Sequence, residues 1–561
     1  MPDALKQLLG MVFTAIGRPD LALRLQKDAS YARALTNERP RLAEAPLSRE
    51  SAYATARTRL DGPDALSFGT LPNGDPVRIR RALAVMSALV LGAAGAGKSR
   101  FLLSLLCEPL RQTIDNLHVD PRAHSEMSVE LELVDPKFET YDLFRKYIAA
   151  LWLRANIAGR ELLERSVRVV DWSREWVTPA TPFDNHFTDI SNPYLAHLRT
   201  DVTVRASGHA YTDSMRQLAY MYNWLLVERR LPPNYRFTVR FMHDAAFRAE
   251  ILRGVPEREV RYYFENFDTT VPRQTRDGFL RRVQYSTSFP EIRASYVPPA
   301  ALDRLGLVRE APITLANTAC TATMPRALGY ERGAWQVMDA LCAAPRRDAR
   351  RSKRLVIEEA GEFLKDPDAE HVDATATGLR TLRSVNMGIV LAAQDFSNAL
   401  PSPVVRNVLL NTTWIAGFRA REDAQIFWPH VVPSPGDRRT DSARRDAFFR
   451  DMASMARQHY MLLVKGEPVL PLRAPDVADP AEVAGVSDDE LVNIFNRQIA
   501  AKSMLRTTTA MKLIEEWEAD VVEKAAVPPA PATTSKKKAA SIGSLADLKK
   551  FFTSDDEEEE T

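Results

Sequence analysis

The chain has 561 residues, more than one hydrophobic core usually organises, so we expect two or three domains. Its 45% hydrophobic and 26% charged residues are ordinary for a globular protein, and a net charge of +2 gives no global signature of a nucleic-acid-binding protein. Three cysteines exclude a disulfide framework, which favours a cytoplasmic protein. The longest apolar stretch, residues 82–96, is too short to cross a bilayer, so we expect no direct membrane span.

The first elements in chain order lead into a glycine-rich loop. Residues 1–60 are rich in Ala, Leu and Arg and predict a helical N-terminal region. The turn sequence Pro-Asn-Gly-Asp at 72–75 predicts a β-hairpin. The apolar run at 88–91 then predicts a buried strand, and the run at 101–106 predicts an apolar helix. The strand, loop and helix follow one another in the order that a phosphate-binding loop requires.

The loop itself, residues 92–99, fits the pattern G-x-x-x-x-G-K-[ST]. Its glycines, Gly92, Gly95 and Gly97, let backbone N–H groups converge on the phosphates of a nucleotide. Lys98 supplies a positive charge to the β- and γ-phosphates, and Ser99 supplies a hydroxyl to Mg²⁺. The alternative is a plain glycine turn before a helix, but the preceding strand and the Lys-Ser pair favour a site for ATP and Mg²⁺.

The remaining strand signals predict a mainly parallel sheet covered by helices on both faces. Buried strands are expected at 131–134, 167–170, 313–315, 355–357, 389–391 and 414–416, with a closing hairpin from 460–464 and 468–472. Residues 192–296 interrupt this pattern because they are helical, aromatic and rich in arginine. We therefore expect one nucleotide-binding α/β domain, residues 61–191 and 297–475, with an all-α domain at 192–296 inserted in it.

The C-terminal part of the chain divides into a helical segment and a tail. A capping box, Ser487-Asp-Asp-Glu490, opens a helix within the segment 476–524. One face of that helix is expected to carry Leu491, Ile494, Phe495 and Ile499. Residues 525–561 predict a flexible linker that ends in an acidic run.

Two carboxylates follow the predicted strand at 355–357. An apolar strand that delivers acids to its end is typical of the Mg²⁺-binding strand of P-loop ATPases. Glu358 stands where Asp is usual and is the predicted metal-side ligand, while Glu359 is the predicted catalytic carboxylate that orients water. Because the Glu358 side chain is one methylene longer than that of Asp, weaker Mg²⁺ coordination and slow ATP turnover are an alternative outcome. The alternative is a buried strand that ends in two solvated glutamates.

Two further side chains are candidates for the reaction. Gln394 follows the strand beside the acidic one and is predicted to contact the γ-phosphate or the attacking water; the alternative is a strand-capping role. Arg383, on a helix that leads to that strand, is the predicted arginine that acts in trans on a neighbouring subunit's γ-phosphate. Arg380, Arg419 and Arg421 are alternatives for the same role.

The order of these motifs over residues 65–475 resembles the FtsK–HerA superfamily of hexameric DNA motors. Within it, the sequence is most similar to the coupling-protein ATPases of type IV secretion and conjugation. The resemblance is carried by Val-Asp-Pro-Lys at 134–137, the helical insertion and Leu-Ala-Ala-Gln at 391–394, besides the phosphate loop. It implies a RecA-like domain with an inserted all-α domain, ATP and Mg²⁺ as cofactors, and ATP sites between the subunits of a homo-hexamer. Coupling proteins usually begin with transmembrane helices, which this sequence lacks.

The resemblance implies an ATP-hydrolysing motor that recruits or translocates a substrate to a type IV secretion channel. The substrate would be single- or double-stranded DNA with its relaxase, or a secreted protein, and further partners would be membrane channel proteins. The location would be the cytoplasm, peripheral to the inner membrane through those partners. Alternatives are the channel- or pilus-assembly ATPase of the same system and a nucleotide-gated receptor with little hydrolysis.

The predicted insertion contains many arginines interspersed with aromatic residues. Such a mixture is typical of a single-stranded DNA surface, because the cations contact the backbone and the rings stack on bases. The alternative is that the rings form a core and the arginines a solvated face. The residues concerned are Arg199, Arg205, Arg216, Arg229, Arg230, Arg236, Arg240, Tyr211, Tyr220, Tyr222 and Trp224.

Overall fold

The computed structural model describes residues 48–523 with internal gaps. The gaps are 63, 121–126, 128, 173–174, 181, 186, 188–189, 208–210, 309, 320–324, 345–349, 365–371, 373–374, 376–377, 380–381, 395, 397–401, 421 and 433–438. Most of the predicted N-terminal helical region, the acidic tail, Arg380 and Arg421 therefore lie outside the described residues.

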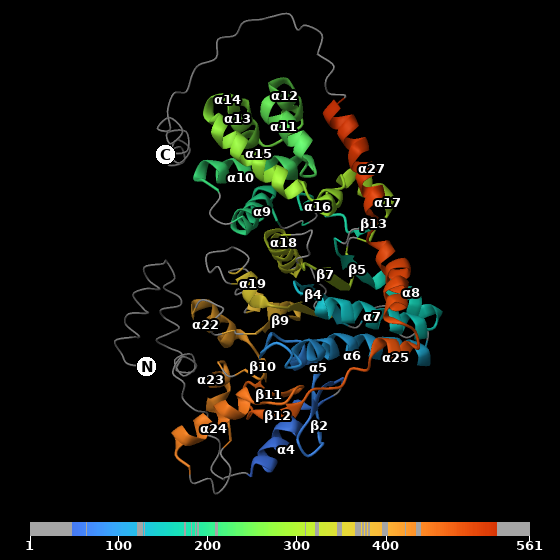
Figure 1. Ribbon diagram of the computed structural model, residues 1–561, viewed down its shortest axis with the longest axis vertical. Helices are drawn as coiled ribbons and strands as arrows, with labels where there is room; N and C mark the ends of the chain where they lie inside the picture. The colour runs from blue at the N-terminus through green and yellow to red at the C-terminus, as the bar shows by residue number, and fades with distance from the viewer. Residues whose placement is uncertain are drawn as a thin grey trace, which may run out of the picture.

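A large sheet forms the centre of the molecule (Figure 1). Its strands are β1 (Leu66–Thr70), β2 (Pro76–Ile79), β3 (Ala88–Gly92), β4 (Val129–Asp135), β5 (Val167–Val170), β7 (Ile313–Asn317), β8 (Ser352–Ile357), β9 (Met387–Ala393), β10 (Trp414–Phe418), β11 (His459–Val464) and β12 (Leu470–Arg473). Within the described residues they pair in the order β2-β1-β12-β11-β10-β3-β9-β8-β4-β7-β5. All neighbours from β10 to β5 are parallel, and those from β10 to β2 are antiparallel. The predicted mainly parallel sheet and its two hairpins are confirmed.

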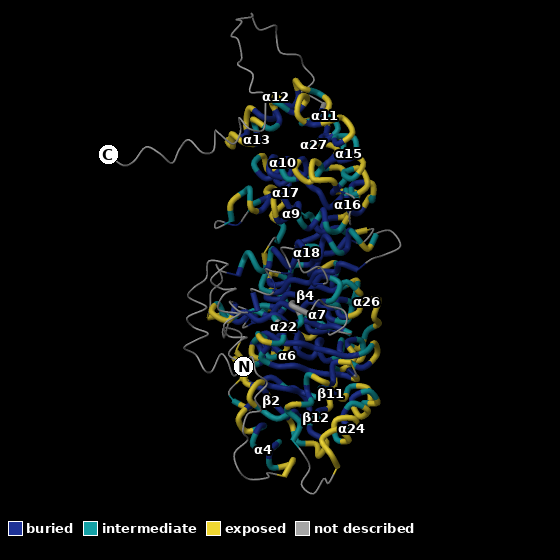
Figure 2. The backbone as a smooth tube through the Cα atoms, turned by 90° about the vertical axis from the view of Figure 1, so that its left-hand side faces the viewer, coloured by how far each residue is buried: buried dark blue, intermediate teal, exposed yellow. Residues whose placement is uncertain are grey.

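Helices cover both faces of the sheet, as the fully apolar strands predict. In β3, Ala88 and Val90 belong to one core, and Leu89 and Leu91 belong to the other. The first core is shared with α6 (Lys98–Val119), α7 (Glu139–Arg154) and α8 (Ile157–Ser166). The second is shared with α18 (Arg326–Ala343), α19 (Ala360–Leu364) and α24 (Asp441–Ala453). Figure 2 shows the strands buried between these layers.

Beyond one end of the sheet, a group of helices has a hydrophobic core of its own (Figure 1). These inserted helices are α9 (Asn192–Ala206), α10 (Asp213–Arg229), α11 (Tyr235–His243), α12 (Ala245–Arg253), α13 (Arg258–Glu265), α14 (Phe267–Thr270) and α15 (Arg273–Thr287). The following α16 (Pro290–Ser295) contributes Ile292 and Ala294 to the second core of the sheet. The expected fold class is thus confirmed for the described residues: an α/β domain with a mainly parallel sheet, an inserted all-α domain and a helical C-terminal segment.

The aromatic residues of the insertion are mostly core residues. Tyr211, Tyr222 and Trp224 are all buried, so the expectation that they stack on bases is wrong. Burial of these large rings supplies much of the apolar area that holds the helices together. Arg199 is also buried, where its guanidinium donates to Pro182 O at 2.8 Å and pairs with Asp339.

The C-terminal segment connects the sheet with the inserted helices (Figure 1). The predicted capping box is confirmed, since Glu490 N donates to Ser487 Oγ at 3.2 Å at the start of α26 (Asp488–Ile494). Further on, α27 (Thr507–Trp517) and η7 (Glu518–Glu523) pack on the insertion. The buried Glu518 carboxylate accepts hydrogen bonds from Asn234 at 2.7 Å and Arg236 at 3.1 Å. Within the described residues, no helix is both long and apolar enough to cross a bilayer.

Candidate nucleotide-binding site

The glycine-rich loop connects β3 with α6 at the carboxyl edge of the parallel strands. Gly92, Gly95 and Gly97 have φ values of 146°, 70° and 114°, which favour glycine. A Cβ atom on Gly92 would also lie 1.8 Å from Phe418 O. Gly97 has no side chain to cap α6, and the first turn of that helix carries no acidic residue. The loop therefore presents backbone N–H groups and the positive end of a helix dipole to an anion.

Lys98 and Ser99 occupy the first turn of α6, as predicted. The ammonium group of Lys98 is buried and donates to Gly92 O, and to Ala93 O at 3.2 Å. Burial lowers the pKa of Lys98, and the charges of Glu359, Lys137 and Glu358 also act on it. The loop and the acidic strand are therefore parts of one site. The Lys98 ammonium, which now donates to loop carbonyls, and the backbone N–H groups of the glycine-rich loop are the groups that a triphosphate needs.

A residue that the sequence analysis did not single out supports this loop from behind. Gln458, just before β11, donates its backbone N–H to Ala96 O at 2.9 Å and accepts from Ala474 N at 2.8 Å. A Cβ atom on Gly97 would lie 3.0 Å from Gln458 N, so the two segments approach closely. Gln458 has a φ of 66° but is not a glycine, and no sequence motif marks it.

Glu358 lies at the end of β8 and is buried. Its Oε1 atom accepts a hydrogen bond from Thr140 Oγ1 at 2.6 Å, a contact that sequence motifs do not indicate. Burial and then the nearby Asp135 carboxylate raise the pKa of Glu358 to about 8. Among the described residues, no group of three or more His, Cys, Asp and Glu side chains is arranged to hold a metal. A Mg²⁺ ion in such sites takes much of its coordination from phosphate and water, with Ser99 and Glu358 as the protein-side candidates here.

Glu359 and Gln394 meet across neighbouring strands. Strand β9 pairs with β3 on one side and β8 on the other, so Gln394 follows the strand that separates the loop from the two glutamates. Gln394 Nε2 donates to Glu359 Oε1 at 3.0 Å, and Lys137 Nζ lies 2.6 Å from the same oxygen. Glu359 has a φ of 46°, an uncommon backbone conformation for this residue type. The catalytic candidate is thus held by two partners.

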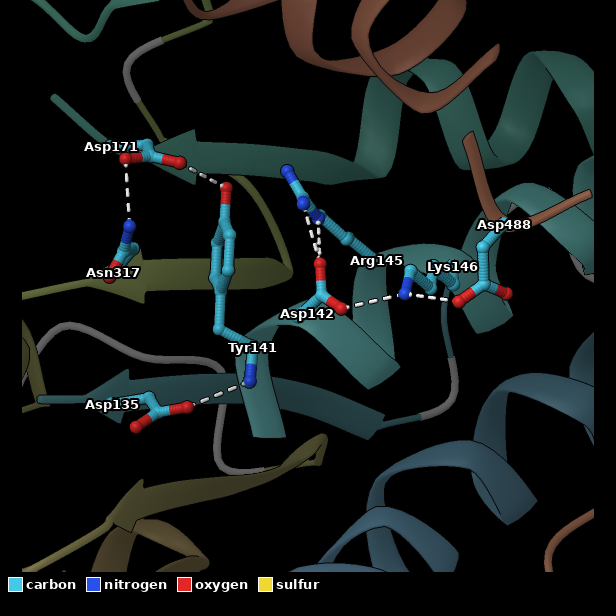
Figure 3. Close-up of polar contacts among 8 residues, drawn as sticks. All are labelled: Asp135, Tyr141, Asp142, Arg145, Lys146, Asp171, Asn317 and Asp488. Atoms are coloured by element: carbon cyan, nitrogen blue, oxygen red, sulfur yellow. Dashed lines mark hydrogen bonds and ion pairs between the residues drawn. The ribbon is translucent and has the colours of Figure 1, made fainter. Parts of the chain in front are cut away.

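A buried polar network fixes the segment that carries Lys137 (Figure 3). The Asp135 carboxylate accepts from the backbone N–H groups of Lys137 at 2.7 Å and Tyr141 at 2.8 Å. The Tyr141 hydroxyl donates to Asp171 at 2.8 Å, and Asn317 donates to the other oxygen of Asp171 at 2.9 Å. These contacts tie together the carboxyl ends of β4, β5 and β7. They place Lys137 at the nucleotide edge of the sheet.

The structure places the arginine candidates differently from the other site residues. Arg383 is exposed in the 3₁₀ helix η3 (Leu382–Val385) that precedes β9. Arg419 is exposed, has a φ of 42° and donates to Met455 O at 3.1 Å. Among the described residues, neither contacts Glu359 or Lys98 of its own chain. An exposed position is what an arginine that acts on a neighbouring subunit requires.

The raised pKa of Glu358 predicts a pH-dependent stability. Because this pKa of about 8 exceeds the ordinary 4.5, the folded chain binds the proton more tightly than the unfolded chain. The resulting stabilisation is complete below about pH 4.5 and is lost as the pH rises through 8. Glu358→Gln is expected to remove a slope that approaches about 1.4 kcal/mol per pH unit. Urea unfolding from pH 5 to 8 measures it, with the exposed Glu362→Gln as control; equal slopes in both variants and the wild type would contradict the prediction.

Comparison with known proteins finds similar solved structures. No family model matches the sequence, and no curated protein matches it. The unbound bacterial conjugative coupling protein TrwBdeltaN70 is 14% identical over 78% of this chain and 97% of that chain, with a TM-score of 0.46. VirB4 of Thermoanaerobacter pseudethanolicus is 12% identical over 75% and 99%, with a TM-score of 0.47. Plasmid coupling protein TrwB in complex with ADP and Mg²⁺ is 14% identical over 78% and 98%, with a TM-score of 0.45. At identities this low, such a likeness concerns the fold alone.

Proposed function

We propose that this protein is a Mg²⁺-dependent P-loop ATPase that works as a homo-hexameric motor or coupling protein of a secretion or conjugation system. The observation that carries the ATPase assignment is the Glu359 carboxylate, held by Gln394 and Lys137 beside the glycine-rich loop. A positioned carboxylate next to a phosphate site is what hydrolysis by water requires. The proposed cargo is DNA with its relaxase, or a secreted protein, and rests on the sequence resemblance.

Each site residue then has a definite task. In the absence of nucleotide, the Lys98 ammonium donates to the carbonyl oxygens of Gly92 and Ala93. Phosphate oxygens are acceptors of the same kind, so the ammonium exchanges the carbonyls for the phosphates when ATP binds. Ser99 and Glu358 would hold the metal, which when bound would neutralise charge on the phosphate oxygens. Glu359 accepts the proton of the attacking water once Lys137 no longer neutralises it. Gln394 keeps Glu359 oriented, and exposed Arg383 serves a neighbouring subunit.

Lys137 provides the resting contact in this scheme. Its side chain is 43% exposed, and its ion pair joins the residues after β4 to Glu359 after β8. Because water reaches the Lys137 side chain, the pair contributes little to stability and is readily exchanged for another partner. While it is formed, the pair occupies an oxygen of the Glu359 carboxylate that would otherwise face water. We propose that this holds hydrolysis low until substrate and nucleotide are both in place.

The motor is tested by ATP hydrolysis with and without single-stranded DNA over a range of protein concentrations. The expected result is turnover that DNA stimulates and that rises more steeply than linearly with concentration, because the site is completed by a neighbouring subunit. Turnover that is indifferent to DNA would overturn a motor that moves DNA and favour the assembly ATPase. The Arg383→Ala variant should lose stimulated turnover, whereas the exposed Arg304→Ala on α17 (Pro299–Leu305) should keep it.

A second candidate function is a nucleotide-gated substrate receptor with little hydrolysis. The observation that favours it is Glu358, whose pKa of about 8 leaves the metal-side carboxyl largely protonated and bonded to Thr140 at neutral pH. Tight ATP binding without turnover in the same assay, at pH 7 and pH 9, would select this function over the motor.

A further inference from the structure

A cavity of about 650 Å³ lies away from the phosphate loop, between the sheet and helix α18. Its walls come from β4, β5 and β7, from α18 and from α9 of the inserted helices. None of the loop residues and neither of the two glutamates after β8 lines it. The cavity therefore belongs to the junction of the α/β domain with the insertion, and it is separate from the proposed nucleotide site.

The cavity is lined by a buried guanidinium group whose N–H groups are largely unsatisfied. Arg332, on α18, is 2% exposed, and within the described residues its Nε and Nη1 atoms have no hydrogen-bond partner, although the charge of the buried Glu331 carboxylate acts on it. Its Nη2 atom donates to Ser295 Oγ at 3.3 Å. The guanidinium stacks on Trp172, Tyr296 and Trp335, with ring centroids 5.2, 4.6 and 4.9 Å away. Cation–π contacts offset part of the cost of burying the charge but satisfy none of its N–H groups.

Other unpartnered donors line the same cavity. In the part of the chain that the structure describes, the buried indole Nε1 atoms of Trp172 and Trp335 have no hydrogen-bond partner. Arg168, on β5, is half-buried, and the carboxylates whose charges act on it are Glu132, Asp339 and Glu310.

Of the three carboxylates that act on Arg168, Glu132 and Asp339 already have other partners. Glu132 lies 2.5 Å from Lys353 Nζ and accepts from Gln336 at 2.7 Å, and Asp339 pairs with Arg199. Glu310 is exposed. Among the described lining residues, the buried side-chain atoms without a hydrogen-bond partner are all donors, and they belong to Arg332, Trp172 and Trp335.

We propose that this cavity binds a small multivalent anion, a phosphate ester or a dicarboxylate, with Arg332 and Arg168 as the groups that recognise it. A buried polar group without a partner is costly, and a ligand rich in oxygen acceptors satisfies the guanidinium and indole donors at once. Because Arg332 lies on α18 and Arg168 on β5, the bound anion bridges the sheet and the helix that packs against α9 of the insertion. The anion would therefore act as a small-molecule effector that stabilises the packing of the inserted helices on the α/β domain.

Calorimetric titration of the full chain with inorganic phosphate, and separately with succinate, tests this site. The titrations use the Lys98→Ala background, since the phosphate loop also attracts phosphate. We expect saturable binding that Arg332→Met weakens at least about tenfold and that Arg304→Ala leaves unchanged. Binding of phosphate but not succinate identifies a phosphate ester, and the reverse identifies a dicarboxylate. The proposal is overturned if neither probe binds, or if both bind equally well to Arg332→Met.

Stability of the variants keeps the test interpretable. Arg332→Met leaves the buried Glu331 carboxylate without the nearby positive charge, so without anion the variant is expected to unfold below the wild-type temperature. It is also expected to lose the rise in melting temperature that the anion produces in the parent, and that loss is the readout specific to the site. Should Arg332→Met fail to fold, Arg168→Gln on the half-buried side of the cavity takes its place, with the same expected loss of binding.

Discussion

Glu359→Gln is expected to keep ATP binding and to lower the rate of hydrolysis by about 10²–10⁴-fold, the contribution of a positioned general base. The amide has the shape of the carboxylate, so Gln394 can still contact it and the loop around Lys98 is unchanged. It cannot accept the proton of the attacking water, which is the step that the carboxylate performs. Single-turnover hydrolysis and binding of a fluorescent ATP analogue, measured in the same preparation, separate the two effects.

The matched control for this variant is Glu362→Gln. Glu362 lies on the same segment, where it pairs with Arg326 at the surface and does not contact Gln394 or Lys137. Its replacement should leave both binding and turnover near the wild-type values, because exposed ion pairs contribute little. Wild-type turnover in Glu359→Gln, or equal losses in both variants, would show that Glu359 is not the base.

The parallel sheet could be predicted from the sequence because its strands are buried on both faces. In β3, β7 and β9 every residue is buried, so each strand reads as a continuous apolar run bounded by turns. The two-residue strands β6 (Trp176–Val177) and β13 (Leu505–Arg506) pair with each other but carry no such signal. Their pairing joins segments more than 300 residues apart, and a local pattern does not contain that information.

The insertion shows where residue composition misleads. Arginine beside aromatic residues predicts a base-stacking surface, yet Tyr222 and Trp224 are core residues of helix α10. The same residue types serve both purposes, and the difference lies in which helix face the neighbours cover. Glu518 illustrates the same limit, because its partners are distant in the sequence: Asn234 just before α11, Arg236 on α11 and Arg293 on α16. Spacing within η7 does not indicate them.

The candidate site was predictable to the extent that its residues follow strand ends. Glu358, Glu359 and Gln394 lie directly after β8 or β9, and Lys98 follows the loop after β3. Parallel strands bring their carboxyl ends to one edge. Contacts made across that edge were not predictable. Thr140 bonds to Glu358 and Lys137 to Glu359 because β4 lies next to β8, an order that only the folded sheet reveals.

Lys98→Ala is expected to weaken ATP binding about tenfold or more and to lower hydrolysis about 10²–10³-fold. The ammonium is the cation buried within the loop, and its alanine replacement leaves the phosphates with backbone N–H groups alone. The charge also acts on the transition state, in which negative charge accumulates on the transferred phosphoryl oxygens. Steady-state hydrolysis at saturating ATP, together with analogue binding, measures both effects.

Loss of the fold must be distinguished from loss of the charge in this variant. Lys98 donates to Gly92 O and Ala93 O, so its removal deprives two loop carbonyls of a partner but also removes a charge that burial disfavours. These two effects oppose each other, and the melting temperature without nucleotide is expected to stay close to that of the wild type. Lys512→Ala, at an exposed position of α27, is the control and should hydrolyse ATP normally. If Lys98→Ala unfolds cooperatively at the wild-type temperature and still hydrolyses ATP at the wild-type rate, the glycine-rich loop is not the site of the reaction.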